Sequence, residues 1–600
     1  MTDLYATIRA HVVAALHKAV PGLPDDVAAR LEVTPTKDPA HGDLATNAAM
    51  IAAKPARLPP TRIAALLAEY LAQAPEIASA TPAGPGFVNI RLTPEALRAT
   101  LPTILLQREA YGDGTLGAGT PVNVEYVSAN PTGPMHVGHC RGAVVGDALA
   151  NLLKKAGYQV TKEYYVNDAG AQVQALAYAA YWRYLQALGT PLTEDEYAAQ
   201  APGGLQYKGD YLIPVGEALQ ATHGPALAAP NNTPAPPGLW LATVQDTAIT
   251  MMLASIKEDL AALGVTPDVW TSERALVAAG APDATIARLQ DQGLIYEGTL
   301  PPPKGKLPEE WEPREQTLFR ATQFGDDVDR PLRKSDGTNT YFANDIAYHA
   351  DKMARGAAQL SGGKPCLMID VWGADHGGYT SRMKSAVRAL SGGSQALDIV
   401  LCQIVHVLRD GQPVRMSKRA GTYVTLSDLL EWVGRDAVRF TMLTRKSDAQ
   451  MEFDLDLAVA QTRENPVYYV QYAHARCRSV LRTAKEAGHD TTPEALANTD
   501  LTPLATEAEL AMALRLAAWP RTVEAAALAH EPHRIAFFLY DLAADFNTLW
   551  SRGNADSTLR FLQADQPEAT RARLALVEAT ATTIRSALAV LGVHPLEELR

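Results

Sequence analysis

The sequence predicts an α/β fold: a Rossmann-like parallel-sheet domain, preceded by an α+β domain and followed by an all-α bundle. Two observations support this organisation. A strand-like run at 122–127, an amphipathic helical stretch at 139–157 and a second strand-like run at 158–166 follow one another, and this order forms a βαβ unit with a right-handed crossover. From about residue 450 onward the chain is alanine-rich, with helical periodicity and no β alternation, which indicates a separate helical domain.

The chain that precedes the βαβ unit has a mixed pattern. Residues 61–73 are typical of a helix and residues 86–92, GFVNIRL, of a strand, so we expect an additional α+β domain over 1–115. The stretch YGDGTLGAGTP at 111–121 contains a literal GxGxxG, but it precedes a strand instead of opening a helix after one. We therefore interpret it as a linker.

The rest of the chain falls into two further domains. We expect the sheet domain over 116–445 and the helical domain over 446–600. Strand-like runs at 366–372 and 398–408 can supply further strands to the parallel sheet.

Two proline-rich stretches interrupt the sheet domain. They lie at 228–238 and 301–308, and we interpret them as surface connections or hinges. The Pro, Gly and Ala content around 195–240 indicates a mobile insertion.

The composition places the protein among ordinary globular proteins. The chain has 600 residues, 47% of them apolar, and no uninterrupted apolar run approaches the roughly 20 residues that span a bilayer. The N-terminus is typical of an amphipathic helix and not of a signal peptide. We therefore expect a cytoplasmic protein with no membrane partner. The four cysteines are scattered, so neither a disulfide framework nor a zinc knuckle is expected.

The net charge of −12 argues against indiscriminate binding of nucleic acid. A local exception is the segment 471–485, QYAHARCRSVLRTAK, which carries four basic residues and no acid. It is either a solvated helix face or a local contact with nucleic acid.

A pair of histidines, His136 and His139, lies in PTGPMHVGHC, on the turn between the first strand of the βαβ unit and its helix. Ligands of open α/β sheets bind at such turns. Gly133 and Gly138 allow close approach of the backbone, and the helix N-terminus and the imidazoles can donate hydrogen bonds to phosphate. A metal site is less well supported, because no third ligand or cysteine pattern accompanies the pair. The histidines could also be merely packed or exposed.

A second basic loop follows the strand-like run that ends at Leu408. The loop GQPVRMSKRAGT at 411–422 presents Arg415, Lys418 and Arg419. A mobile lysine there could travel with a leaving pyrophosphate, although a plain surface loop would look the same.

Together, HVGH and RMSKR resemble the HIGH and KMSKS signatures of the class I aminoacyl-tRNA synthetases. Arg415 and Arg419 differ from the usual Lys and Ser, whereas Met416, Ser417 and Lys418 match. Almost the whole chain resembles bacterial arginyl-tRNA synthetases, in the blocks VEYVSANPTGPMHVGH, YYVNDAGAQV, SDGTNTYFANDIAYHADK, DVWGADHGGY and DAVRFTMLTRKSD.

The resemblance implies where the small substrates bind. It assigns the arginine side chain to Glu125, Tyr341 and Asp345, with Asn130 and His136 near the α-amino and carboxylate groups. Carboxylates and an aromatic face suit a planar guanidinium. The ATP site implied by the resemblance comprises Gly133, Gly138, His136, His139, Gly373, Asp375, His376, Met416, Ser417 and Lys418. His136, His139 and Lys418 would be catalytic. Gly377 stands where the family usually has a second histidine.

The resemblance also implies the reaction and its partners. Arginine attacks ATP to give arginyl-adenylate, and the 2′-hydroxyl of the 3′-terminal adenosine of tRNA(Arg) then takes the arginyl group. ATP enters with Mg²⁺, and no zinc, organic cofactor or obligate protein partner is expected. In this family arginine activation waits for tRNA, and a monomer is usual. The implied tRNA contacts are Phe87, Asn89, Tyr468, Tyr472 and Arg476. Phe87 would stack on an unpaired base, although it could instead belong to the core.

Other functions fit some of these features. The function could also be that of a glutaminyl or cysteinyl enzyme of the same class. The missing zinc ligands weaken the cysteinyl alternative, and the TYFAND carboxylate favours a cationic substrate. A small-molecule adenylyltransferase would need neither terminal domain. A non-catalytic tRNA-binding regulator would be expected to have lost the histidines and Lys418.

Overall fold

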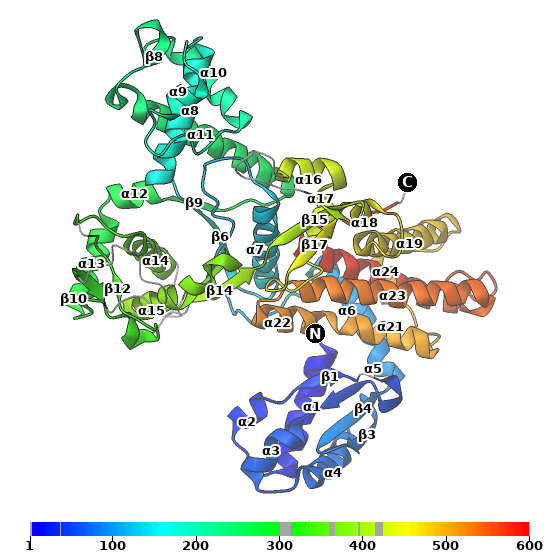
Figure 1. Cartoon of the computed structure of the whole chain (residues 1–600). Coiled ribbons are helices and arrows are strands. Elements are labelled where there is room, and N and C mark those ends of the chain that lie inside the picture. Colours follow the sequence, from blue (N-terminus) through cyan, green and yellow to red (C-terminus); the bar gives the residue numbers. More distant parts are fainter. Residues whose placement is uncertain are drawn as a thin grey trace. The chain divides into compact units, whose positions relative to one another are not determined.

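The computed structural model describes residues 3–36, 38–300, 314–334, 336–358, 366–393, 397–414 and 424–598. The chain divides into two compact units. The first comprises Met1–Gly114, Gln461–Ala529 and Arg534–Arg600, and the second comprises Thr115–Ala460 and His530–His533. Figure 1 labels their helices and strands.

The second unit is built on a five-stranded parallel sheet with the strand order β14-β13-β5-β6-β9. The strands are β5 (Pro121–Glu125), β6 (Gln159–Val166), β9 (Val269–Ser272), β13 (Leu367–Gly373) and β14 (Leu397–Cys402). From the central strand β5 the chain adds β6 and β9 on one side, and later β13 and β14 on the other. The strand order therefore reverses between β5 and β13, and ligands of open α/β sheets bind at such a switch point.

The predicted βαβ unit is confirmed. Its helix is α7 (Val137–Lys155), which joins the parallel strands β5 and β6. All five residues of β5 are buried, as expected for a central parallel strand with both faces covered. The predicted linker at 111–121 is also confirmed, because its residues form turns and irregular backbone up to the start of β5.

The strand prediction at 398–408 was wrong in one respect. The run splits at Gln403 and Ile404: β14 belongs to the parallel sheet, whereas β15 (Val405–Arg409) lies in a separate three-stranded sheet with β16 (Gln412–Pro413) and β17 (Met451–Asp454). The Gln403 backbone is held at the break, because its N–H donates to Ser447 O at 2.8 Å and its carbonyl accepts from Arg141 at 3.0 Å. β17 also contradicts the prediction that no strand follows residue 450. Its alternation covers only four residues, which is too short for the sequence pattern to reveal it.

Further elements of this unit include a second three-stranded sheet, of the antiparallel strands β10 (Ile295–Thr299), β11 (Glu315–Phe319) and β12 (Arg330–Pro331). Further helices of the unit are α12 (Glu273–Ala278), α13 (Ala281–Asp291), α14 (Tyr341–Ala358), α15 (Thr380–Ser391), α16 (Leu426–Val433), α17 (Arg435–Met442) and α18 (Leu455–Val459).

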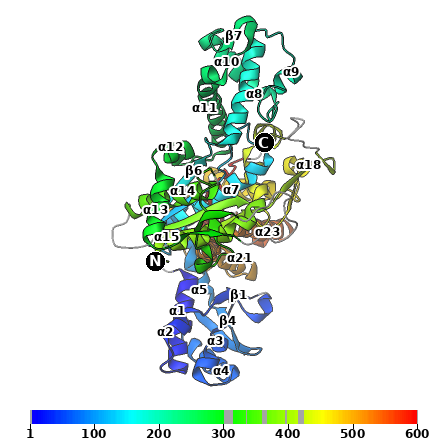
Figure 2. The same ribbon diagram turned by 60° about the vertical axis from the view of Figure 1, so that its left-hand side comes forward.

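The insertion between β6 and β9 is a packed helical lobe, visible in Figures 1 and 2 as helices that extend from the sheet. Its elements are α8 (Ala171–Ala187), α9 (Glu194–Ala198), α10 (Ile213–His223), β7 (Ala228–Ala229), β8 (Thr233–Pro234) and α11 (Pro237–Leu263). Tyr181, Tyr197 and Trp240 are buried in its core. The expectation of a mobile excursion around 195–240 was therefore wrong, because buried aromatic rings hold the proline-rich chain in place. The other proline-rich stretch, 301–308, lies outside the described residues.

The first unit contains the expected α+β part. Its four-stranded antiparallel sheet has the order β1-β2-β4-β3. The predicted helix and strand are α4 (Pro60–Leu71) and β4 (Phe87–Leu92). α4 buries Ile63, Leu67 and Leu71 at helical spacing. The other elements are α1 (Leu4–Ala19), α2 (Asp25–Ala29), β1 (Val33–Pro35), β2 (Leu44–Thr46), α3 (Ala48–Ala56), β3 (Ile77–Ala83), α5 (Pro94–Arg98) and α6 (Thr100–Gln107).

The C-terminal part of the same unit is helical, as predicted. Its helices are α19 (Pro466–Glu486), α20 (Pro493–Ala497), α21 (Glu507–Ala517), α22 (Trp519–Ala529), α23 (His533–Ala555) and α24 (Pro567–Leu591). By length and composition alone, α11 and α24 among the described helices could cross a membrane. The apolar window of α24 is 89% buried and that of α11 is 33% buried, and polar residues interrupt both helices. A buried core helix has the same composition, so this is weak support for a membrane span.

Candidate functional site

The two histidines cap the N-terminus of α7. The Gly138 N–H donates to His136 Nδ1 at 3.1 Å, and the His136 N–H donates to His139 Nδ1 at 3.4 Å. Their rings are stacked with centroids 3.8 Å apart. Because both Nδ1 atoms accept, a neutral ring carries its proton on Nε2 in each case. A Cβ on residue 138 would approach His136 Cε1 to 2.9 Å, so this stacked arrangement requires glycine.

The chain after the RMSKR loop pairs with the residues on either side of His136. The Val137 N–H donates to Val424 O at 3.2 Å, and the Leu426 N–H donates to Met135 O at 2.9 Å. Arg415, Met416, Ser417, Lys418 and Arg419 lie outside the described residues. Lys418 is six positions before Val424, so it is within about 20 Å of chain length from the histidine turn.

The backbone after β5 is strained. Val127 has φ of 70° and Ser128 has φ of 40°, values that are costly for a β-branched residue and uncommon for serine. The Ser128 N–H donates to Tyr126 O at 3.0 Å, which closes a tight turn around Val127. The turn places Ser128 Oγ to donate to Glu125 Oε1 at 2.9 Å. Strain of this kind is typical of functional sites.

Glu125 is buried, with an exposed fraction of 5%. Its Oε2 accepts a hydrogen bond from the ammonium of Lys352, which also donates to Asp370 Oδ1 at 2.8 Å. Asp370 lies beside Glu125 in the register of β13 and β5. The predicted substrate carboxylate is thus already part of an ion cluster.

α14 carries the other two residues predicted to hold the arginine side chain. Tyr341 is its first residue and is 62% exposed. Asp345 follows one turn later, and its Oδ2 accepts from the Tyr379 hydroxyl at 2.6 Å. Burial raises the pKa of the Asp345 carboxyl to about 6. The two side chains come from one end of the helix, as their spacing predicts.

A further carboxylate, Glu273, lies near Asp345 at the start of α12. It is 6% exposed, and its Oε1 accepts from Asn344 Nδ2 at 3.0 Å. Burial raises the pKa of Glu273, and Asp168 adds to this effect. A buried acidic pocket with carboxylates of raised pKa favours a cationic ligand.

Tyr165 borders the same pocket from the end of β6. Its ring stacks on Tyr348 with centroids 4.0 Å apart, and its buried hydroxyl has no hydrogen-bond partner among the described residues. Burial raises the pKa of this hydroxyl, with Glu273, Asp345 and Glu125 contributing. A buried hydroxyl without a partner is costly, so a polar ligand group that pairs with it would lower this cost.

The helical lobe contacts the histidine turn at two points. Asn130 Nδ2 donates to Gln172 Oε1 at 2.6 Å, and the Tyr211 hydroxyl donates to Thr132 O at 2.8 Å. A Cβ on residue 133 would lie 3.2 Å from the Tyr211 ring. The lobe therefore supports the backbone that carries Asn130 and Gly133.

The residues predicted for the adenosine side follow β13, across the switch point. Gly373 is the last residue of the strand, and Asp375 and His376 lie in the following short 3₁₀ helix, Ala374–Tyr379. The side chains of His376 and Asp375 are 63% and 82% exposed. A Cβ on Gly377 would make only an ordinary contact with Leu401, so the missing second histidine leaves the local fold unchanged.

The predicted RNA contacts lie in the first unit. Phe87 is 39% exposed, so the alternative that it belongs to the core was wrong. Asn89 is half-buried in β4. On α19, Tyr468 and Tyr472 stack, and the Arg476 guanidinium lies over Tyr472 at 4.0 Å and bonds to its hydroxyl at 2.7 Å.

The basic character of segment 471–485 is partly neutralised by the fold. Arg478 pairs with Glu578 at 3.0 Å and with Glu597 at 2.8 Å, and Arg482 pairs with Glu598 at 3.7 Å. Acids distant in sequence supply these partners, so the basic run does not form an unbroken positive stripe.

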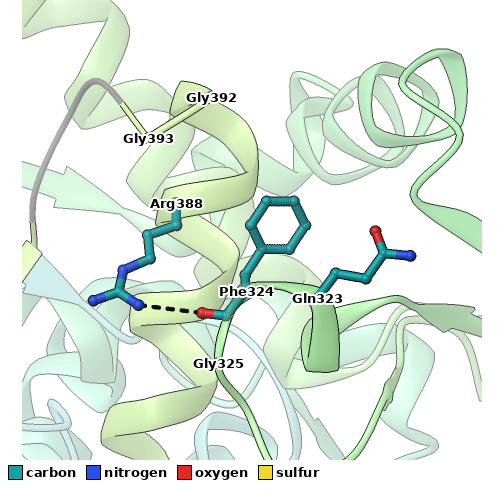
Figure 3. Close-up of a pocket in the computed structure, with 6 residues that line it drawn as sticks. All are labelled: Gln323, Phe324, Gly325, Arg388, Gly392 and Gly393. Carbon is teal, nitrogen blue, oxygen red and sulfur yellow. Dashed lines mark hydrogen bonds between the residues drawn. The ribbon is translucent and has the colours of Figure 1, made fainter.

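A pocket of about 440 Å³ lies elsewhere in the second unit, and none of the predicted site residues line it. Figure 3 shows the residues that line it. The pocket is lined by Gln323, Phe324, Gly325, Arg388, Gly392 and Gly393. It lies at the C-terminal end of α15, a helix of 12 residues that begins next to Tyr379. A helix of that length spans about 18 Å, so this pocket is remote from Asp345.

Three family models match the chain. They are the arginyl tRNA synthetase N terminal domain over residues 6–92, the class I (R) tRNA synthetase catalytic domain over 100–188, and the DALR anticodon binding domain over 470–599. The arginine–tRNA ligase of Gluconobacter oxydans (strain 621H) is 60% identical over 599 residues, which cover 100% of this chain and 98% of the relative. This chain belongs to the arginyl-tRNA synthetase family.

Further relatives of this arginyl-tRNA synthetase agree. The arginine–tRNA ligase of Ruegeria pomeroyi (strain ATCC 700808 / DSM 15171 / DSS-3) is 53% identical, with 100% of both chains covered. The solved structure of Thermus thermophilus arginyl-tRNA synthetase has a TM-score of 0.71 and covers 99% of this chain; at 24% identity it supports the fold alone. The enzyme class is ligase, and the activity of the family is arginine–tRNA aminoacylation.

Sequence reasoning missed several residues that lie at or next to this candidate site. Three had a signal in the sequence. His349 and Lys352 continue the face of α14 that begins with Asp345, at helical spacing. Asp370 is a lone acid inside the apolar run CLMIDVW. Glu273, Tyr165, Gln172 and Tyr211 had no such signal, because strand pairing and the helical lobe bring them to the site.

Proposed function

We propose that this chain forms arginyl-adenylate from ATP and L-arginine, and then transfers arginine to the 2′-hydroxyl of the 3′-terminal adenosine of tRNA(Arg). The observation that supports the proposal is that the histidine turn follows β5 and pairs with the chain at Val424–Leu426, just after the RMSKR loop. Glu125 and Glu273 are buried at the carboxyl ends of β5 and β9 in the same sheet. ATP enters as its Mg²⁺ complex, with the metal held mainly by the phosphates.

The proposed ATP site uses the N-terminus of α7. The Nε2 protons of His136 and His139, together with the helix N-terminus, would donate to the triphosphate as its charge shifts toward pyrophosphate. Gly133 and Gly138 let the phosphates approach the backbone. Gly373, Asp375 and His376 would contact the adenosine, and Met416, Ser417 and Lys418 the triphosphate. The protein contributes mainly positioning and charge stabilisation, as in other displacements at phosphorus.

The proposed arginine site lies beside it. Glu125, Tyr341 and Asp345 would hold the guanidinium, and Glu273 and the Tyr165 hydroxyl would assist them. Asn130 and His136 would lie near the α-amino and carboxylate groups, where the reacting carboxylate must meet the α-phosphorus. This arrangement would favour a long cationic amino acid.

The proposed tRNA contacts assign a role to each part of the chain. The domain at 1–115 would contact an unpaired tRNA base through Phe87 and Asn89. The domain at 446–600 would contact the anticodon through Tyr468, Tyr472 and Arg476. Residues 116–445 would carry out the chemistry. We further propose that the enzyme acts in the cytoplasm as a monomer, without a membrane or an obligate protein partner, and without zinc.

An aminoacylation assay with bulk tRNA and each of the twenty amino acids tests the proposal. We expect charging with arginine alone, and ATP–pyrophosphate exchange that appears only when tRNA is added. Charging with glutamine or cysteine, or arginine-independent adenylyl transfer to a small molecule, would support one of the alternative functions instead.

The pKa of Asp345 predicts how arginine binding depends on pH. Arginine is a cation and binds the ionised carboxylate, whose pKa in the empty pocket is about 6. Below that pH the proton must leave before arginine binds, so the KM for arginine should rise roughly tenfold per pH unit. Above about pH 7 it should be constant. Steady-state charging assays across this range measure the effect, and a KM that stays constant well below the pKa would contradict it.

A second prediction concerns Phe87. Stacking of an aromatic side chain on a base contributes about 1–3 kcal/mol, so Phe87→Ala should raise the KM for tRNA between about 5-fold and 150-fold. The KM values for arginine and ATP should not change. Met50 is 43% exposed beside Gly86, so Met50→Ala is a matched control that removes apolar surface without a ring. An equal effect of both substitutions would show that Phe87 does not stack on a base.

A further inference from the structure

Three carboxylates lie in one row across the central strands of the parallel sheet. Glu163 of β6 is in register with Glu125 of β5, and Glu125 is in register with Asp370 of β13. Neighbouring strands lie about 4.8 Å apart, and side chains at the same level point to the same face. All three carboxylates are buried, so without cations they would repel one another strongly.

α14 supplies the cations that match this row. Arg355 donates from both guanidinium NH groups to Glu163, at 3.0 and 2.7 Å. One turn earlier, the Lys352 ammonium donates to both Glu125 and Asp370. Lys352 is 1% exposed, so no water replaces these contacts. The row and the two cations therefore fix the position of α14 along its axis.

His349 joins α14 to β13. Its Nδ1 lies 2.8 Å from the Asp345 carbonyl oxygen, and its Nε2 lies 2.9 Å from Asp370 Oδ2. Asp370 therefore contacts both Lys352 and His349, whereas Glu125 contacts Lys352.

The two carboxylates respond differently to their surroundings. Burial raises the pKa of Glu125, and Lys352 is the strongest opposing influence. Burial also favours a higher pKa for Asp370, but Lys352 and His349 together lower this pKa to about 2. Asp370 is thus firmly ionised, whereas Glu125 depends on Lys352 for its charge.

We infer that Lys352 is a positioning residue of the arginine site: its ammonium, held between Glu125 and Asp370, keeps the Glu125 carboxylate ionised and fixed before the cationic substrate arrives. Lys352 is itself held by Asp370, so Glu125 can share its charge with a substrate cation while Lys352 stays in place. This inference rests on the proposed role of Glu125 in arginine binding.

The charged and titratable groups around Glu125 come from three elements. They are Asp345, Tyr348, His349 and Lys352 on α14, Asp370 on β13, and Glu163 and Tyr165 on β6. Lys352 is the cation that bonds directly to Glu125 among the described residues. Its removal should therefore move the ionisation of Glu125 toward neutral pH.

The test is the KM for arginine, measured by charging of tRNA with the full-length enzyme. The assays run between about pH 7 and about pH 8.5, because Asp345 titrates below this range. We expect Lys352→Met to raise this KM by roughly tenfold or more at the lower pH, and the KM to fall as pH rises and Glu125 ionises. The wild-type KM should be constant across the range, and kcat should change less than KM. Lys352→Arg keeps the charge and should show a raised KM without the pH dependence.

Three further variants separate the outcomes. Arg355→Met removes the neighbouring cation of the same helix, which bonds to Glu163 and Asp351 instead of Glu125, and it should leave the pH profile flat. If Lys352→Met fails to fold, the double variant Lys352→Met/Glu125→Gln takes its place, and its KM should be raised but independent of pH. Glu125→Gln alone should raise the KM.

Two results would overturn the inference. One is a flat pH profile for Lys352→Met, and the other is the same pH dependence in Arg355→Met or in the double variant. An unchanged KM in Glu125→Gln would instead overturn the proposed role of Glu125 itself, so the two failures are distinguishable.

Discussion

Lys418→Ala should lower the rate of arginyl-adenylate formation by a factor of about 10²–10³, the usual cost of one preorganised charge donor at a displacement. The reason is that the ammonium of Lys418 would stabilise charge that develops only as pyrophosphate leaves. The KM for arginine should therefore change little. Pre-steady-state formation of pyrophosphate in the presence of tRNA measures the step.

The control for Lys418→Ala is Lys208→Ala, in the helical lobe. Lys208 forms an exposed ion pair with Glu194 at 2.8 Å, and such pairs contribute little to stability or activity. An unimpaired rate for Lys418→Ala, or an equal loss in both variants, would refute the proposed role of Lys418 in charge stabilisation.

Asp345→Asn should weaken arginine binding as strongly as Lys418→Ala slows the chemistry. Removing one partner of a buried charged pair costs about 2–5 kcal/mol, which corresponds to a rise in the KM for arginine between about 30-fold and several thousand-fold. The rise of KM toward acid pH should also become smaller, because one titrating carboxyl is gone while Glu273, whose pKa burial also raises, remains. Steady-state charging at saturating ATP and tRNA measures both effects.

The matched control lies on the same helix. Asp351 is a half-exposed carboxylate of α14 that pairs with Arg355 at 2.7 Å, and Asp351→Asn should leave the KM for arginine within about twofold. A normal KM in Asp345→Asn would show that the guanidinium is held elsewhere in the pocket.

Patterns of short range predicted much of this molecule from its sequence. The βαβ unit, the linker at 111–121 and the helical C-terminal part follow from periodicity and turn composition, and the structure has them, except that the strand β17 lies within the stretch predicted to be helical. The histidine pair was predicted on a strand-to-helix turn, and the turn lies there because His136 and His139 themselves cap α7. Local signals of this kind suffice when the residues involved are close in sequence.

Long-range features could not be predicted in the same way. The run 398–408 is continuous in hydrophobicity, and at its break Gln403 contacts Ser447 and Arg141, which are distant in sequence. The core of the helical lobe depends on aromatic rings that meet only when α8 and α11 pack. The acidic row of β6, β5 and β13 requires the strand order and register, which a single sequence does not specify.

The most direct test of the account is a crystal structure of the enzyme with L-arginine and a non-hydrolysable ATP analogue. The account predicts that the imidazoles of His136 and His139 and the ammonium of Lys418 all lie within about 3.5 Å of one triphosphate, with the arginine guanidinium at Asp345. A structure in which these three side chains face separate cavities, or in which the triphosphate binds away from the N-terminus of α7, would contradict it.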